Sequence, residues 1–176
     1  NLTAELQKDF DFGLSTSVAY SYTKAESQLK TTEIASALWQ ELPVQGDPNN
    51  PNVANSEFGI RHRISGSANY RHVWGERNRF ATTVGTFFSI AEGNQFTVGG
   101  GNRYSYIYSG DVNGDGSGAN DLIYIPSDPS EINLVDPSQW DALDAFIEQD
   151  DYLSENRGQI AERFGAVNPW FANLDL

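Results

Sequence analysis

The residues best suited to chemistry form a short segment rich in Asp, Asn and Gly. The segment 111–117, Asp-Val-Asn-Gly-Asp-Gly-Ser, places oxygen-bearing side chains at alternate positions and a glycine at the sixth. This spacing is typical of a calcium loop, because its ligands alternate along the chain and the chain turns sharply at the glycine. The candidate calcium ligands are Asp111, Asn113, Asp115, Ser117 through its backbone carbonyl, and Asp121.

The second half of this segment departs from the full calcium loop. The bidentate Glu of the twelfth position is missing, because Leu122 stands there and Asp121 comes one residue early. Asp and Asn followed by Gly also form ordinary turns without a metal. Two interpretations therefore stay open, a weak calcium site and a metal-free turn.

The other polar residues do not form a catalytic constellation. The carboxylates between Asp141 and Glu155 lack a nucleophile, a His partner and the spacing of a carboxylate pair, so a solvated helix face explains them. Glycines 99–101 lack the Lys and Ser/Thr that follow in a phosphate loop. His62 and His72 are too far apart in the chain to share a metal, and we expect them at an interface or packed. We therefore expect no enzyme, and no cofactor other than calcium.

Alternation of apolar and polar residues predicts the strands that position these residues. A period of two runs through 2–6 and 14–22, with a short turn between them, and again through 58–70 and 80–90. Each pair of runs predicts a β-hairpin. Residues 170–176 begin one more alternating run.

The connections between these runs alternate between short and long. The long ones are 26–57 and 97–169, and loops of this length are uncommon in compact soluble domains. Outer-membrane barrels, in contrast, have short periplasmic turns and long outer loops. We therefore predict two barrel hairpins joined by a long outer loop in residues 1–96. A long acidic outer loop follows over 97–169, and 170–176 start a further strand.

The two faces of the predicted strands differ in chemistry. One face is apolar and is expected to meet lipid, with Val84 near mid-membrane, while the other is rich in Ser, Thr, Asn, Arg and Gly and is expected to line a wet interior. Tyr70, Trp74 and Phe80 gather near one short turn, where an aromatic girdle belongs. An antiparallel sandwich in water also alternates in this way. The predicted lipid-facing set is Leu14, Val18, Tyr20, Ile60, Ile64, Ala68, Val84, Phe88 and Ile90.

Short helices are predicted inside the long connections. A brief helical turn is expected near Glu33–Trp39. Asp136 is a helix cap with Pro137 at the first helical position, so a helix should begin there. A second helix, from about Leu153 to Phe164, should end at Gly165.

Charge and composition exclude several classes of protein. The net charge is −13 and uneven: residues 1–100 hold 8 Lys+Arg and 10 Asp+Glu, whereas residues 101–176 hold 3 and 14. Such an acidic second part would repel nucleic acid. Cysteine is absent, which excludes disulfides and thiolate metal sites. No apolar run approaches the roughly 20 residues of a membrane-spanning helix.

Several segments together resemble a known family. Five stretches resemble the late barrel strands and outer loops of Oar-like TonB-dependent outer-membrane receptors. They are the opening hairpin from Gly13-Leu14 through 19–25, the segment from 61–63 up to Tyr70, residues 104–116 (YSYIYSGDVNGDG), residues 120–126 (NDLIYIP), and the stretch that runs from 155–158 (ENRG) to 168–170 (NPW). The resemblance implies a barrel of about 22 strands with a plug inside it. It also implies uptake of a scarce nutrient driven by the inner-membrane TonB complex.

The predicted fold class is therefore all-β, a fragment of an antiparallel transmembrane β-barrel with long loops that carry short helices. The chain begins at Asn1 and contains no Met, so we expect an interior piece of a longer protein. The expected partners are outer-membrane lipid, an unknown nutrient ligand, and the TonB complex through parts absent from this chain. The alternative, from a different class, is a secreted calcium-stabilised β-sandwich that binds carbohydrate or a surface protein through the tyrosines at 104–108.

Overall fold

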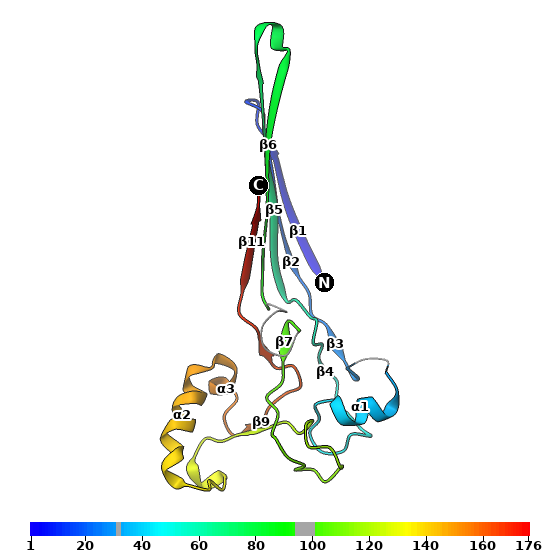
Figure 1. The fold of residues 1–176 in the computed structure, drawn as a ribbon, viewed down its shortest axis with the longest axis vertical. Coiled ribbons are helices and arrows are strands. Elements are labelled where there is room, and N and C mark those ends of the chain that lie inside the picture. The colour runs from blue at the N-terminus through cyan, green and yellow to red at the C-terminus, as the bar shows by residue number, and fades with distance from the viewer. Residues whose placement is uncertain (31–32, 94–100) are drawn as a thin grey trace.

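A long, narrow antiparallel sheet forms one half of the molecule, and a lobe of short elements forms the other (Figure 1). The computed structural model describes residues 1–30, 33–93 and 101–176. The strand order in the sheet is β1-β2-β5-β6-β11, and every neighbouring pair is antiparallel, which confirms the antiparallel sheet of the predicted fold class. The strands are β1 (Leu2–Asp9), β2 (Leu14–Tyr22), β5 (His62–Trp74), β6 (Phe80–Ala91) and β11 (Phe171–Asp175).

Both short turns lie at the end of the sheet away from the lobe (Figure 1). In the β1–β2 turn, Gly13 has φ +92°, and a Cβ there would collide with the carbonyl oxygen of Arg71. The β5–β6 turn contains η1 (Glu76–Asn78), where Arg77 and Asn78 adopt φ of +60° and +55°. Strands β5 and β6 continue past the β1–β2 turn, so this hairpin projects beyond its neighbours.

The register of the sheet places most of the large apolar residues of the five strands on one face. Gly66 is opposite Val18 on one side and Phe88 on the other, and Phe88 is opposite Leu174. A Cβ on Gly66 would come within 2.7 Å of the Phe88 ring. The glycine therefore lets this ring lie across β5, as aromatic side chains do over glycines in sheets.

The alternating run predicted over 58–70 forms a strand only from His62, where β5 begins. One residue of the predicted lipid-facing set is therefore misplaced. Ser56 donates its N–H to the Ala25 carbonyl, and the Gly59 N–H donates back to the Ser56 carbonyl. This turn holds the chain out of the sheet until His62. Ile60, which the alternation assigned to the lipid face, therefore lies before the strand.

The two long connections build the lobe. Because β2 ends at Tyr22 and β5 begins at His62, the first spans residues 23–61; the second spans 92–170. Both are longer than the alternation suggests. The predicted boundary at 96/97 and the glycines 99 and 100 lie outside the described residues. Lobe elements are β3 (Glu26–Ser27), α1 (Ala35–Glu41), β4 (Ala54–Asn55), β7 (Arg103–Tyr104), β8 (Tyr124–Ile125), η2 (Pro129–Glu131), η3 (Pro137–Gln139), α2 (Trp140–Gln149), α3 (Asp151–Glu155), β9 (Gln159–Ile160) and β10 (Ala166–Val167).

The hydrophobic core sits in the lobe and not beneath the sheet. Its buried members are Ile125, Ile147, Leu153 and Ala161, with Leu143 packed against them. Helix α2 therefore turns its apolar face inward, which is the ordinary role of an amphipathic helix.

One helix start is confirmed and one helix is shorter than predicted. Asp136 accepts a hydrogen bond from the Ser138 N–H at 2.9 Å and so caps η3 directly before α2. Helix α3 ends at Glu155, so the predicted helix from Leu153 to Phe164 is wrong. The cause is Gly158, which has φ +75° and donates its N–H to the Ile125 carbonyl, and this turns the chain into β9.

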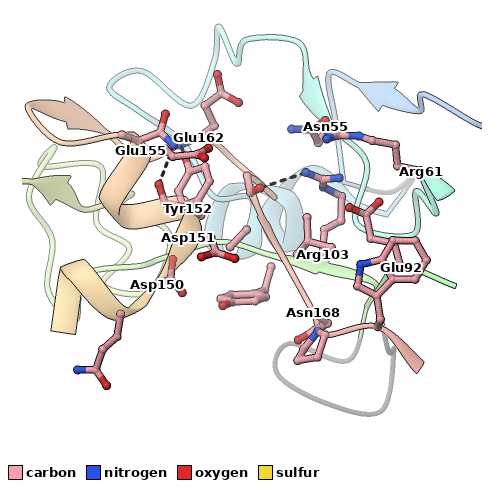
Figure 2. Close-up of a pocket in the computed structure, with 18 residues that line it drawn as sticks. Asn55, Arg61, Glu92, Arg103, Asp150, Asp151, Tyr152, Glu155, Glu162 and Asn168 are labelled. Carbon is pink, nitrogen blue, oxygen red and sulfur yellow. Dashed lines mark hydrogen bonds between the residues drawn. The ribbon is translucent and has the colours of Figure 1, made fainter. Parts of the chain in front are cut away.

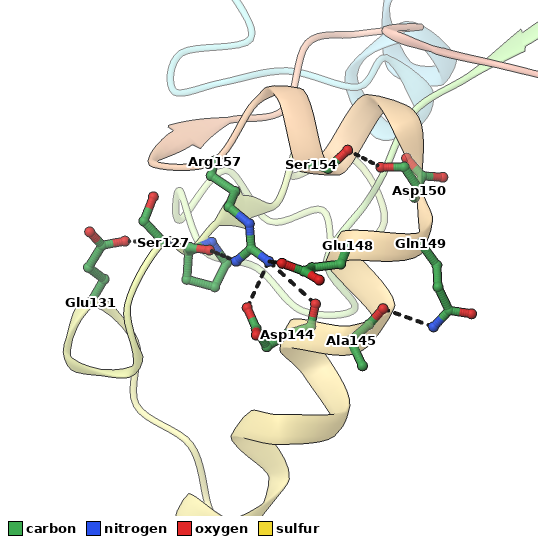
Figure 3. Close-up of polar contacts among 10 residues, drawn as sticks. Ser127, Glu131, Asp144, Ala145, Glu148, Gln149, Asp150, Ser154 and Arg157 are labelled. Atoms are coloured by element: carbon green, nitrogen blue, oxygen red, sulfur yellow. Dashed lines mark hydrogen bonds and ion pairs between the residues drawn. The ribbon is translucent and has the colours of Figure 1, made fainter.

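Arg157 fastens the end of α3 to α2. Its Nη2 lies 2.7 Å from Asp144 Oδ1, and its Nη1 donates to the Pro126 carbonyl (Figure 3). One guanidinium thus joins both helices and the strand β8, which precedes Pro126.

Candidate functional site

One face of the sheet exposes its apolar side chains. Leu6 is 75% exposed, Val84 59% and Leu174 64%. A sandwich in water would cover such a face with a second sheet about 10 Å away. A contiguous exposed apolar face instead marks a surface that another apolar phase covers. This exposure argues against the secreted sandwich.

An aromatic cluster lies on this face at the lobe end of the sheet. The ring of His62 has its centroid 5.3 Å from that of Tyr22 and 6.3 Å from that of Trp170. The Tyr20 hydroxyl lies 2.7 Å from His62 Nδ1. We call Tyr20, Tyr22, His62 and Trp170 the lobe-end cluster. Its four residues come from three segments, β2, β5 and the residue before β11.

A second aromatic cluster lies on the same face at the turn end. Trp74 and Phe80 stack with centroids 4.9 Å apart, and Tyr70 stacks with His72 at 6.3 Å. The Trp74 indole N–H donates to Thr82 Oγ1 at 3.0 Å. We call Tyr70, His72, Trp74 and Phe80 the turn-end cluster. The girdle predicted from Tyr70, Trp74 and Phe80 is confirmed as a cluster.

The distance between the two clusters matches the apolar thickness of an outer membrane. His62 and His72 belong to the two clusters and to the single strand β5. At about 3.3 Å per residue their separation along the strand is about 33 Å. A strand tilted by 35–45° converts this into roughly 25 Å along the barrel axis, which is the height of the apolar band of outer-membrane barrels.

The opposite face of the sheet is polar. Ser17 donates to Glu5 Oε1 at 2.9 Å on this face. Phe87 and Val73 are exceptions, because the register places them here and they are 47% and 41% exposed. Other members of the polar face are Ser15, Ser21, Arg63, Ser65, Ser67, Asn69, Arg71, Thr83, Ser89 and Asn173.

The register moves Val84 away from the middle of the apolar band. Val84 is opposite Tyr70 of the turn-end cluster, whereas Val18 is opposite Gly66, midway between the clusters. We therefore expect Val18→Arg to cost about 2–4 kcal/mol of unfolding free energy, and Val84→Arg distinctly less, because the cost of a lipid-facing charge falls toward the interface.

Ser17→Arg is the matched control, because it adds the same charge on the adjacent, polar face. Denaturant titration of the complete barrel in lipid vesicles, followed by tryptophan fluorescence, measures all three costs. Equal costs for Val18→Arg and Ser17→Arg would show that the faces are assigned wrongly.

The five candidate calcium ligands lie in one turn of the lobe. Asp111 Oδ1 accepts hydrogen bonds from the N–H groups of Gly114 (2.7 Å) and Asp115 (3.0 Å), and its Oδ2 accepts from Gly116 (3.0 Å). Asp121 is buried and accepts from the Val112 N–H at 2.7 Å. These carboxylates thus stabilise the turn by accepting hydrogen bonds from its backbone N–H groups.

The same turn is docked on the C-terminal end of α1, which sequence patterns did not reveal. The Trp39 indole N–H donates to the Asp115 carbonyl at 2.9 Å, and the Ser117 hydroxyl donates to the Gln40 carbonyl at 3.0 Å. Asn120 is fully buried and its Nδ2 donates to both the Trp39 carbonyl and Asp115 Oδ2. The turn therefore joins the two long connections.

The hydrogen bonds also set the charge of Asp115. Burial acts to raise its pKa, but hydrogen bonds from the Ser117 N–H and from the Asn120 and Asn113 amides outweigh this, so the pKa lies below its ordinary value. Among the described residues no three His, Cys, Asp or Glu side chains converge as metal ligands. Calcium binding at this turn therefore stays a prediction. The carboxylates of Asp111, Asp115 and Asp121 already accept hydrogen bonds from backbone N–H groups of the turn.

We expect weak calcium binding, with a Kd of about 10⁻⁴–10⁻³ M, the range of extracellular modules. Calorimetry and protease protection of the lobe, with and without calcium, would measure it in the wild type and in Asp111→Ala and Asp115→Ala. Asp128→Ala is the control, because Asp128 caps η2 in the same lobe through the Ser130 N–H. No heat and no protection at millimolar calcium would leave a metal-free turn.

A cavity of about 760 Å³ lies between the lobe-side ends of β5 and β6 and helix α3. Figure 2 shows Arg61, Glu92 and Arg103 on one side of it and Asp151 and Glu155 on the other. Its size falls within the range of small-molecule sites. No sequence pattern indicated this cavity, because its walls come from segments far apart in the chain.

Two hydrogen-bond networks, one buried and one partly buried, hold the walls of the cavity in place. Arg103 is 5% exposed and donates to the Phe164 and Gly165 carbonyls; burial, and then the charge of Arg61, lower its pKa. Tyr106 donates to Asp150 Oδ2 at 2.5 Å, and burial followed by this hydrogen bond raises the pKa of Tyr106.

None of the described helices is long and apolar enough to cross a membrane.

The family model described as an outer membrane beta barrel domain matches residues 1–176. No curated protein and no solved structure matches the chain. The family places the protein in the bacterial outer membrane, in agreement with the two aromatic clusters and the apolar face between them. The chain therefore belongs to the outer membrane beta barrel domain family.

Proposed function

We propose that this chain forms wall and outer loops of a TonB-dependent uptake receptor of the Oar-like kind, a non-enzymatic role. The observation that carries the proposal is the lobe: two long connections leave the same end of the sheet and are fastened to each other. A barrel that only anchors itself in the membrane has no need of such an elaborate lobe. A receptor needs one, because loops held by a rigid scaffold recognise the solute before transport.

Contacts between the two connections support a lobe that acts as one body. Val44 exchanges backbone hydrogen bonds with Asn120 and Leu122. Arg163 is 4% exposed, and its Nη2 donates to the carbonyls of Ser27 (2.6 Å) and Asn52 (3.0 Å). These bonds cross from one connection to the other.

The edges of the sheet support a larger barrel. Strands β1 and β11 are each paired on one side only within the described sheet. Unpaired backbone groups are not tolerated in lipid, so both edges require further strands. Large transporters of about 22 strands enclose a plug, and the polar face of this sheet is suited to contact one.

The proposal predicts that the lobe faces the medium and the short turns face the periplasm, by the rule of short turns and long loops. Single cysteines at Asn50 and Gly118, both exposed in the lobe, should react with an impermeant thiol reagent on whole cells. Cysteines at Asp9 and Glu76, exposed at the turn end, should react only after the outer membrane is opened. The reverse pattern would invert the orientation.

The proposal also predicts dependence on TonB. Mass spectrometry of spent medium should show one set of solutes that is left unconsumed by cells lacking this protein and by cells lacking TonB. The double mutant should consume no less of these solutes than the TonB mutant alone, because both losses block one route. Consumption that persists without TonB but stops without this protein would contradict energy coupling.

A further inference from the structure

One wall of the cavity presents charged groups that have no partner among the described residues. Arg61 is half-buried directly before β5, and its backbone is fixed because its carbonyl accepts from the Thr23 N–H at 2.9 Å. In the part of the chain that the structure describes, its guanidinium makes no hydrogen bond and no ion pair. Glu92 directly follows β6 and lines the same cavity, and its Oε2 is buried with no hydrogen-bond partner in the described part of the chain.

The opposite wall presents free carboxylates on α3. Asp150 is already used, because it accepts from the Leu153 N–H at 2.8 Å and from the Tyr106 hydroxyl. Asp151 and Glu155 differ from it: both line the cavity, and neither has an ion pair among the described residues. Figure 2 shows these two groups across the cavity from Arg61.

Arg103 cannot neutralise these acids. Its Nε and Nη2 donate to the Phe164 and Gly165 carbonyls, which pull it into the wall. Arg61 nevertheless lies close enough for its charge to contribute, after burial, to the lowered pKa of Arg103. The side of the cavity that carries Arg61 therefore holds two guanidinium groups, Arg61 and Arg103, and the one carboxylate of Glu92, whereas α3 contributes only acidic groups to the other side.

We propose that this cavity binds a short peptide by its two charged ends, with the terminal carboxylate on Arg61 and the terminal ammonium on Asp151 and Glu155. Arg61 is half-buried without a partner among the described residues, which raises the free energy of the empty site, and a bound carboxylate removes that cost. Asp151 and Glu155 are exposed on the opposite wall, where they present the complementary charge to an ammonium group. An anion would satisfy only Arg61, and a simple amine only the acids. Asn55 and Tyr104 also line the cavity, and their polar side-chain groups can offer hydrogen bonds to peptide amides.

This inference rests on the uptake function proposed above, and direct binding tests it separately from transport. The complete protein, purified in detergent, would be titrated with trialanine by calorimetry. Trialanine with a free amino and a free carboxyl end should bind. Acetylation of its amino end or amidation of its carboxyl end should each weaken binding by about two- to fivefold, the loss expected for one partly exposed ion pair.

Substitutions in the two walls of the cavity test which wall binds the carboxylate end of the peptide and which binds its ammonium end. Arg61→Gln should weaken binding of trialanine but leave the affinity for its amide unchanged, because the amide has no carboxylate to lose. Asp151→Asn with Glu155→Gln should do the same for the acetylated peptide. Arg71→Gln, on the polar face at the turn end, is the control and should bind like the wild type. Arg61→Lys should retain part of the affinity, which separates loss of charge from loss of folding.

The outcomes separate the two proposals. Equal affinity for free and capped trialanine, or no binding of either, would overturn the peptide site while leaving TonB-dependent consumption of other solutes intact. Binding that follows the predicted pattern in a protein whose solutes are consumed without TonB would support the peptide site and reject the energy coupling.

Discussion

The backbone hydrogen bonds between antiparallel strands are the constraint on which the rest of the structure depends. In lipid no water satisfies an N–H or C=O group, so every strand must pair with neighbours along its length. Pairing at fixed register then decides where each side chain points. The row Val18, Gly66, Phe88 and Leu174 crosses four strands on one face, and the apolar face and both aromatic clusters follow from the same alignment.

The lobe is stabilised by different means, because it lies outside the apolar band. Its buried core is small, so much of its order comes from polar side chains that donate to backbone carbonyls. Arg163 ties the two connections in this way, and Arg103 ties β7 to the residues before β10. Closing long loops has an entropic cost, and these bonds between connections offset it. The Asp111–Asp121 turn also links the two connections, through its hydrogen bonds to Trp39 and Gln40 of α1.

The cavity exists because these two parts meet. Strand ends supply Arg61 and Glu92, and the lobe supplies Arg103 and the acids of α3. The groups that hold the walls are hydrogen-bonded and at least partly buried, whereas Arg61, Asp151 and Glu155 have no ion pair among the described residues. This division between fixed and free charges is what a recognition site requires, because preorganised walls lower the cost of ordering on binding.

The sequence by itself determined the local features of this protein. Period-two alternation predicted the hairpins and their unlike faces, and Asp136 followed by Pro137 predicted the helix start, because strand period and capping depend on neighbouring residues. Tertiary structure decided the rest. Pairing of β11 with β6 brings Trp170 to His62, and docking on α1 gives the Asp111–Asp121 turn its partners. Ile60, the length of α3 and the depth of Val84 were mispredicted because contacts with distant residues, absent from any local pattern, fix them.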